Sequence, residues 1–371
     1  MNIILFDANR AKFFPLSYTR PIAEFRVGIL TIKEKWQHFF KNVSIKTEDY
    51  LSKKYPISIK DDNIWIDSCF MPSKSFFTEL ISLRNGEGLE MNGKLIAFRN
   101  SIFDLSKINR IETTSSLKHI NNICDIFSGN GIEIESDFKL ITKGKESLKL
   151  NETNTVLGSN IFVEHGVKVS CSILNAEKGP IYIGKNAEIM EGSIIRGPFA
   201  MGEGSVLKMG SKIYGPTTLG PYCKVGGEVN NSVFFGYTSK AHDGYLGNSV
   251  IGEWCNLGAD TNNSNLKNNY EEVKLWNYEE NRFIKTGLQF CGLVMGDHSK
   301  CGINTMFNTG TVVGVSTNIF GSGFPRNFVP SFSWGGANSF KVYKLLKVFE
   351  VATKVFARRN LNFDTKEKQI L

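Results

Sequence analysis

Apolar residues return at every sixth position through much of the second half of the chain. A period of six fits neither an α-helix, which repeats every 3.6 residues, nor a plain β-strand, whose side chains alternate. It fits a coil with flat faces, in which each hexad supplies one short strand and one corner around a narrow prism. The pattern therefore predicts a left-handed parallel β-helix. The inward residues of its longest uninterrupted run are Ile183, Ile189, Ile195, Met201, Leu207, Ile213, Leu219 and Val225.

The first half of the chain lacks this period and predicts an α/β fold. Residues 2–6 and 64–67 form short apolar runs typical of strands, and residues 28–40 carry a helix-like pattern. The polar, lysine-rich stretch 129–150 indicates a junction, and the apolar side of 340–359 predicts a helix that covers the open end of the β-helix or a subunit seam. We therefore expect an α/β domain over residues 1–140, a β-helix over 150–335 and a C-terminal helix over 338–360.

The composition limits the classes of partner that the protein is expected to bind. A net charge of +8 favours acidic partners in general, but the basic residues are spread along the chain without an aromatic-basic RNA motif. We therefore expect phosphate-bearing small molecules and no nucleic acid. No apolar run approaches the roughly 18 residues of a membrane span, and the N-terminus lacks a secretory pattern. Seven cysteines without a CxxC pair are typical of reduced thiols, so we expect a cytoplasmic protein with no membrane contact.

The hexad pattern is interrupted at residues 235–247 and again from 256 through 290. Insertions into a solenoid form loops on one face, and such loops usually carry the site. His242 lies in the first interruption, on a loop flanked by glycines. A single histidine is more often structural, but its place in this loop favours a general base that deprotonates a substrate amine during attack on a thioester. Glu228, about one coil earlier, is the candidate to orient the imidazole ring.

The same segment resembles the acetyltransferase half of the bifunctional N-acetylglucosamine-1-phosphate uridylyltransferase/glucosamine-1-phosphate acetyltransferase (GlmU-type) family. The later run 296–305 is similar to archaeal-type relatives, which carry a hairpin insert where residues 267–290 stand. The matching residues are Ser239-Lys-Ala-His242-x-x-Tyr245-Leu-Gly, then Asn256-Leu-Gly-Ala259-Asp-Thr261, and finally Asn265.

This resemblance implies a role for each matching residue. His242 is the implied general base, Tyr245 and Asn256 contact a sugar phosphate, and Ala259 and Asn265 line the acetyl-CoA site. The family forms homotrimers in which coenzyme A binds between neighbouring β-helices. The sequence departs from the family at two cations. The phosphate-binding lysine expected near residues 230–231 is absent, and Met201 replaces a motif arginine.

The N-terminal half resembles the sugar nucleotidyltransferases, through Pro15-Leu-Ser-Tyr-Thr-Arg-Pro21 followed by Arg26-Val-Gly28. In those enzymes a glycine-rich loop after the first strand holds the nucleotide phosphates through backbone N–H groups. Here Phe6-Asp-Ala-Asn-Arg10 replaces that loop. Arg10, Arg20 and Arg26 either take over as nucleotide ligands or form salt bridges in a degenerate scaffold. Asp67, at the end of a predicted strand, is the candidate Mg²⁺ ligand.

Three interpretations follow from these patterns. The whole chain looks like a divergent GlmU-type branch found in Bacteroidetes, which implies acetyl transfer from acetyl-CoA to glucosamine-1-phosphate and nucleotidyl transfer from UTP. The first alternative is an acetyltransferase with a degenerate N-terminal domain. The second is a trimeric β-helix scaffold without catalysis. The grouping of the motif residues in the interruptions argues against a scaffold, because a scaffold has no need to break its hexads there.

Overall fold

A mixed six-stranded sheet organises the N-terminal part of the computed structural model, which describes residues 1–371. The strand order is β2-β1-β3-β5-β4-β6. Strands β1, β2 and β3 are parallel, and β5 is antiparallel to both of its neighbours. Strands β1 and β3 are buried throughout, as their unbroken apolar runs predict. The strands are β1 (Asn2–Phe6), β2 (Val43–Lys46), β3 (Asn63–Asp67), β4 (Glu87–Met91), β5 (Lys94–Arg99) and β6 (Asn109–Glu112).

The helices around this sheet differ from the sequence prediction in two places. The expected helix over 28–40 is confined to α1 (Ile32–Gln37), because Thr31 and Glu34 form a capping box that starts it. The expected junction contains α5 (Asn130–Thr142), whose Ile134 and Ile141 pack with Ile29. The other helices are α2 (Asp49–Ser52), α3 (Lys74–Ser82) and α4 (Cys124–Ser128), with 3-10 turns at Arg10–Phe13, Leu16–Tyr18 and Ile22–Glu24.

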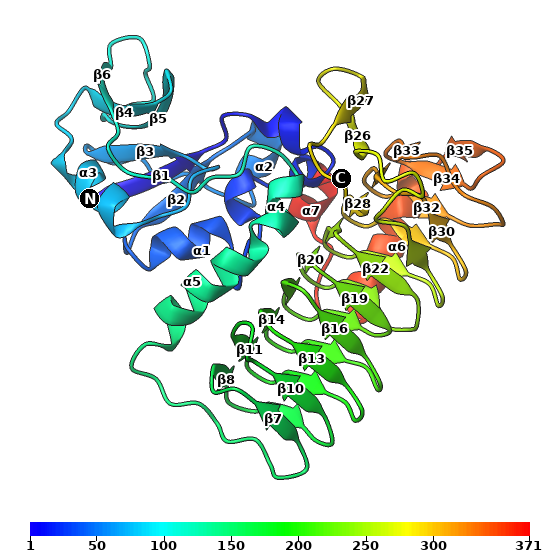
Figure 1. Ribbon diagram of the computed structural model, residues 1–371. Helices are drawn as coiled ribbons and strands as arrows, with labels where there is room; N and C mark the ends of the chain where they lie inside the picture. The colour runs from blue at the N-terminus through cyan, green and yellow to red at the C-terminus, as the bar shows by residue number, and fades with distance from the viewer.

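The second half is the predicted β-helix, a stack of coils with three flat faces (Figure 1). The first face holds β7 (Thr155–Leu157), β10 (Ile173–Asn175), β13 (Ile194–Arg196), β16 (Lys212–Tyr214), β19 (Glu228–Asn230) and β22 (Tyr245–Gly247), with β25 (Asn262–Asn263) and β30 (Met306–Phe307) beyond it. The second face holds β8 (Ile161–Val163), β11 (Ile181–Ile183), β14 (Phe199–Met201), β17 (Thr217–Leu219), β20 (Val233–Phe234), β23 (Val250–Ile251), β28 (Leu293–Met295), β31 (Thr311–Val313) and β33 (Phe328–Val329). The third face holds β9 (Lys168–Val169), β12 (Glu188–Ile189), β15 (Val206–Leu207), β18 (Lys224–Val225), β21 (Ser239–Lys240), β24 (Asn256–Leu257), β29 (Lys300–Cys301), β32 (Asn318–Ile319), β34 (Ser333–Gly335) and the antiparallel β35 (Phe340–Val342).

The predicted inward residues form the core of this prism. The eight apolar residues of the longest run are all buried and belong to one cluster that runs the length of the coil. The fold class expected from the period of six is thereby confirmed. The second interruption forms a hairpin of β26 (Lys274–Asn277) and β27 (Arg282–Lys285).

The chain ends in two helices, α6 (Leu345–Ala357) and α7 (Thr365–Ile370). Of the two placements expected for α6, the one across the open end of the prism is wrong, and the one at a subunit seam stays a prediction. Phe356 of α6 stacks on Trp254, with ring centroids 4.0 Å apart, so the helix lies along the corner between the second and third faces. Helix α7 then reaches α2, where Lys54 pairs with Glu367 at 2.8 Å. No helix is long and apolar enough to span a bilayer.

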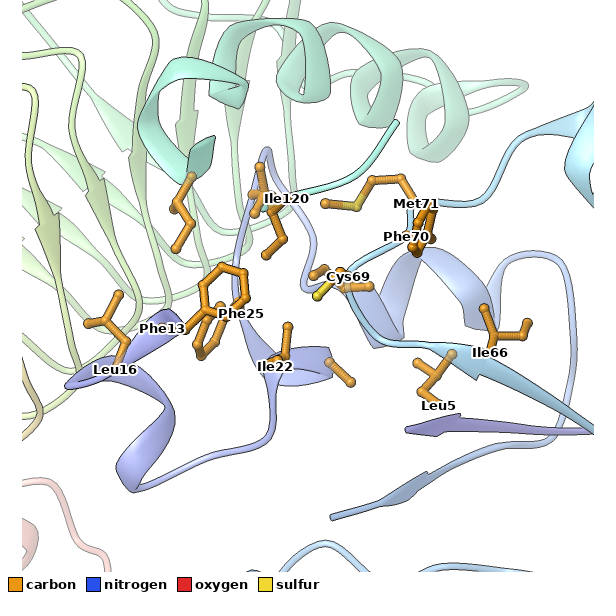
Figure 2. Packing of buried hydrophobic residues seen from close by; sticks show 14 of the residues in the cluster. Leu5, Phe13, Leu16, Ile22, Phe25, Ile66, Cys69, Phe70, Met71 and Ile120 are labelled. Atoms are coloured by element: carbon orange, nitrogen blue, oxygen red, sulfur yellow. The ribbon is translucent and has the colours of Figure 1, made fainter. Parts of the chain in front are cut away.

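The N-terminal part packs on the second face of the β-helix. One buried cluster joins the sheet to Phe235, Val250 and Val294, whose side chains point outward from that face. Figure 2 shows Leu5 and Ile66 of the sheet in the same cluster as Phe13, Leu16 and Phe25, whose segment lies beside the β-helix. In a triangular prism the corner between the third and first faces lies opposite the second face. This corner carries the first interruption of the hexads.

Candidate active site at the His242 corner

Residues 241–244 join β21 on the third face to β22 on the first, and His242 is exposed at this corner. Hydrogen bonds fix the loop to the coils on both sides. The N–H of Gly226 donates to the Lys240 carbonyl at 2.8 Å, and the N–H of Asp260 donates to the Asp243 carbonyl at 3.0 Å. The imidazole is therefore presented to solvent on a backbone that is held from below and above.

Glycine is required where the loop turns. Gly244 has φ of +114°, and a Cβ atom there would collide with the carbonyl oxygen of Thr261 in the next coil. The neighbouring coils pass too closely for any side chain at this position. This explains the glycine that follows His242 by two residues in the interruption.

Lys240 is an unexpected cation inside the prism. Its side chain is 1% exposed and takes the inward position that Val225 and Leu257 occupy in the adjacent coils. The ammonium donates to the carbonyl oxygens of Gly226 at 2.9 Å and His242 at 3.0 Å. Burial lowers the pKa of Lys240 to about 8, against the opposing effect of nearby carboxylates. Lys240 thus holds the His242 backbone in place from beneath, as a positioning residue.

This burial predicts a pH dependence of stability. Because the folded pKa is lowered, the unfolded chain binds more protons between pH 8 and about 10.5, so the Lys240 penalty to stability is relieved as pH rises through that window. At about 1.4 kcal/mol per pKa unit, the gain approaches about 3 kcal/mol. Urea unfolding of the wild type and of Lys240→Met at pH 7 to 10 tests this. Above pH 8 the free energy of unfolding of the wild type should rise relative to that of the variant, and parallel curves would contradict the prediction.

Glu228 does not pair with His242 as the sequence predicted. It begins β19 on the first face, and its carboxylate accepts a hydrogen bond from the Tyr214 hydroxyl in the coil below. The carboxylates at the corner itself belong to Asp243 and Asp260, whose loops stack on one another. Neither was predicted from the sequence, although Asp243 is adjacent to His242.

Tyr245 and Asn265 lie together on the first face. The Asn265 amide donates to the Tyr245 hydroxyl at 3.0 Å and to the Asn248 side chain at 2.8 Å. Burial is the largest cause of the raised pKa of Tyr245, so the phenol remains a neutral hydrogen-bonding group. The structure therefore places Tyr245, for which the resemblance implied a sugar-phosphate contact, against Asn265, for which it implied a place in the acetyl-CoA site.

Asn256 and Ala259 approach the corner from its other side. Asn256 is exposed on the third face in register with Ser239, and the Ala259 carbonyl accepts from the Asn304 N–H at 2.8 Å in the next coil. Tyr245 and Asn256 thus lie on two faces that meet at His242. A ligand that touches both must pass around the corner that carries the imidazole.

The third face also supplies a cation that the sequence analysis missed. Met201 is buried in the prism and cannot replace the motif arginine. Lys224, however, is exposed on β18 in register with Ser239 and hence in line with Asn256. Burial and the charges of Arg359, Lys208 and Arg358 lower the pKa of Lys224. The outward position of Lys224, one strand from Ser239, could be predicted from the hexad pattern. The proximity of Arg358 and Arg359 could not, because it depends on where α6 packs.

The three arginines proposed as nucleotide ligands form hydrogen bonds and ion pairs with other groups of the protein. Arg10 pairs with Asp7 at 3.0 Å and donates to the Tyr50 hydroxyl at 2.9 Å. Arg26 donates to the Ile29 carbonyl and lies 3.6 Å from a carboxylate oxygen of Glu34. All three residues are buried. As they are placed, none presents a free guanidinium fork to a triphosphate.

Arg20 instead connects the two halves of the chain. It donates to Asp297 and pairs with Glu253 at 2.9 Å, both on the β-helix. The hydroxyl of Thr19 reaches the same Asp297 carboxylate at 2.6 Å. These carboxylates raise the pKa of Arg20 well above its usual value, against the opposing effect of burial, which is the largest single one. Its role is docking of the N-terminal part, a correction to the predicted phosphate contact.

Asp67 lies where β1 and β3 end, the edge at which open α/β sheets bind ligands. One of its carboxylate oxygens accepts from the Cys69 N–H at 3.0 Å and the other from Lys94 at 2.6 Å. The side chain is fully buried, and no three His, Cys, Asp or Glu side chains gather into a metal site. The predicted Mg²⁺ ligation by Asp67 does not fit these contacts. Lys94, partly exposed, is the cation that pairs with Asp67 at this edge.

Comparison with known protein families gives a match to the N-terminal part of the chain. Residues 3–146 match a family described as sugar nucleotidyl transferase. This confirms, for the N-terminal part, the coarser prediction of a sugar-nucleotidyltransferase-like domain. No curated protein matches the sequence.

Solved structures align only distantly. AntD, an N-acyltransferase from Bacillus cereus in complex with dTDP and 3-hydroxybutyryl-CoA, is 12% identical, with 55% of this chain and 91% of that chain covered and a TM-score of 0.25. The polySia specific acetyltransferase NeuO is 14% identical, with 52% and 87% covered and a TM-score of 0.23.

Proposed function

We propose that the β-helix transfers an acetyl group from acetyl-CoA to the amine of an amino-sugar phosphate, with His242 as the general base. The observation that carries the proposal is an exposed imidazole on a loop fixed from both sides, at the meeting of two faces. Tyr245 and Asn265 flank it on the first face, and Asn256 and Lys224 flank it on the third. Polar groups converge on the histidine from both directions, as a bound phosphorylated sugar requires.

The chemistry follows from the position of the base. His242 accepts a proton from the substrate amine as its nitrogen attacks the thioester carbonyl carbon. The carbon–nitrogen bond forms, the carbon–sulfur bond breaks, and the departing thiolate takes up the proton to give free coenzyme A. Lys224, with Arg358 and Arg359 nearby, supplies positive charge for the sugar phosphate in place of the missing motif cations.

For the substrates, we propose glucosamine-1-phosphate and acetyl-CoA, in the route to a UDP-N-acetylglucosamine-type product. A second activity, nucleotidyl transfer from UTP by the N-terminal part, is favoured by the family match of residues 3–146. Asp67 and Lys94 mark its strand edge. Because each Asp67 oxygen already accepts a hydrogen bond from a protein donor, we propose that any Mg²⁺ there enters with the nucleotide rather than as a resident ion.

A thermal-shift titration of the full chain tests this assignment against its alternatives. A ligand that binds only the folded state stabilises it by about 2.7 kcal/mol at a hundredfold excess over Kd. The proposal expects stabilisation by acetyl-CoA and, separately, by UTP. Stabilisation by acetyl-CoA alone supports an acetyltransferase with a degenerate N-terminal domain. Stabilisation by neither ligand supports the scaffold and overturns the proposal.

The proposed activity also predicts a homotrimer. One chain leaves the His242 corner open to solvent, and a neighbouring prism is needed to enclose coenzyme A against it. The second face is already covered by the N-terminal part, so the first and third faces remain for contact. Light scattering should give about three times the chain mass of 41.5 kDa. A monomer that is active at the assay concentration would contradict this prediction.

A further inference from the structure

The β26–β27 hairpin borders an open pocket at the corner between the first and second faces. Its volume of 580 Å³ lies within the range of about 300–1,000 Å³ that is typical of small-ligand sites. Its wall is formed by Lys267, Lys274, Trp276, Phe283, Thr309, Arg326, Asn327 and Phe328. None of these residues belongs to the His242 corner. We call it the hairpin pocket.

The hairpin is seated firmly on the coil. Gly310 has φ of +70°, and a Cβ atom there would come within 2.6 Å of the Lys274 carbonyl oxygen. Trp276 stacks on Phe328 with ring centroids 4.3 Å apart and planes 9° apart. Phe283 meets the indole edge-on at 5.3 Å. The pocket therefore has a fixed aromatic wall built from the hairpin and the last coils.

The charges around this wall are all positive. Lys267, Lys274 and Arg326 line the pocket, and no carboxylate does. Lys267 donates to a backbone carbonyl at 3.0 Å and lies 3.9 Å from Glu271. Lys274 and Arg326 are exposed, and neither forms an ion pair within the chain. A bound anion has two unpaired cations to contact here.

We infer that the hairpin pocket binds a nucleotide, with the base against the aromatic wall and the phosphates on Lys274 and Arg326. Every nucleobase has a face for stacking on aromatic side chains, and guanidinium matches phosphate through paired N–H donors. A purely apolar ligand would form no ion pair with the three cations. A free phosphate would not stack on the aromatic wall.

The pocket is linked to the candidate site through the first face. The Thr309 hydroxyl lies 2.7 Å from that of Ser264, and the next residue, Asn265, donates to the Tyr245 hydroxyl. The nucleotide therefore comes from one of two sources, the adenosine 3′,5′-bisphosphate end of coenzyme A or a nucleoside diphosphate that carries a sugar. For coenzyme A, the inference rests on the proposed acetyl transfer.

Calorimetric titration of the full chain with adenosine 3′,5′-bisphosphate and, separately, with UDP tests the inference. One of the two should bind, and its identity names the source. Arg326→Gln and Trp276→Ala should each weaken that binding by about 10-fold or more. Arg282→Gln is the matched control, since Arg282 is on the same hairpin but pairs with Glu280 and does not line the pocket. Its affinity should equal that of the wild type.

Two results overturn the inference. One is no binding of either nucleotide by the wild type at millimolar concentration, and the other is binding that Arg326→Gln and Trp276→Ala leave unchanged. Because Trp276→Ala removes part of the wall, an unchanged melting temperature of Arg326→Gln provides the independent check on folding. Nucleotide binding by His242→Ala separates this inference from the proposed function. The variant should retain the wild-type affinity even if the chain proves unable to transfer acetyl groups.

Discussion

His242→Ala is expected to lower kcat for acetyl transfer by about 10²–10⁴-fold while the Kd for acetyl-CoA stays nearly unchanged. The imidazole is exposed at the corner and is the group placed to accept the amine proton, whereas the loop backbone is held by Lys240 and by neighbouring coils. Removing the side chain therefore removes the base without unfolding its support. Release of coenzyme A thiol measures kcat, and calorimetry measures Kd.

His165→Ala is the matched control for this variant. His165 is also an exposed histidine at a glycine-containing coil corner, but it lies between β8 and β9, several coils away. Its turnover should equal that of the wild type. An unchanged kcat in His242→Ala would move the base elsewhere, and Asp243 and Asp260 are then the next side chains to replace.

Arg20→Ala is expected to cost about 3–5 kcal/mol of unfolding free energy, because it leaves a buried carboxylate without its cation. Asp297 is 3% exposed and takes its charged partner from across the interface between the two halves of the chain. Urea unfolding measures the loss. Arg282→Ala is the control, since its exposed pair with Glu280 is worth about 0–1 kcal/mol.

Arg20→Lys separates docking from nucleotide binding. A single ammonium lacks the planar fork that reaches Asp297 and Glu253 together, so docking predicts an intermediate loss of stability. UTP affinity, measured under conditions where the variant is folded, should be unchanged. A loss of UTP affinity without a loss of stability would instead restore Arg20 as a phosphate ligand.

The sequence predicted the β-helix well because its physical cause is local and repeated. Each inward position needs an apolar residue, and the cluster from Ile183 to Val225 contains no exception. The interruptions were equally visible, and they led to His242. The strands Asn2–Phe6 and Asn63–Asp67 followed from unbroken apolar runs, since both faces of a central parallel strand are buried.

The partners of charged side chains could not be predicted in the same way. Glu228 was assigned to His242 by its distance along the coil. It belongs to the first face, where its carboxylate accepts a hydrogen bond from the Tyr214 hydroxyl. Arg20 was assigned to phosphate because arginine matches phosphate chemically. Its actual acceptors, Asp297 and Glu253, lie more than two hundred residues away in the sequence and meet it only when the two halves dock. Such pairings depend on tertiary packing, which no local pattern encodes.

Lys240 shows the converse case. In a strict hexad pattern a lysine indicates an outward position. Because the first interruption breaks the pattern, the inward position of Lys240 could not be predicted from the sequence. Only the register with Val225 and Leu257 reveals it. The hydrogen bonds from its ammonium to Gly226 and His242 then explain why a cation is tolerated in an apolar prism.

The most direct test of acetyl transfer at the His242 corner is product analysis with ¹³C-acetyl-CoA and glucosamine-1-phosphate. Mass spectrometry should detect labelled N-acetylglucosamine-1-phosphate with the wild type and with His165→Ala, and almost none with His242→Ala. If the wild type binds acetyl-CoA yet forms no labelled sugar phosphate, or if His242→Ala forms it as fast as the wild type, the account of this site is contradicted.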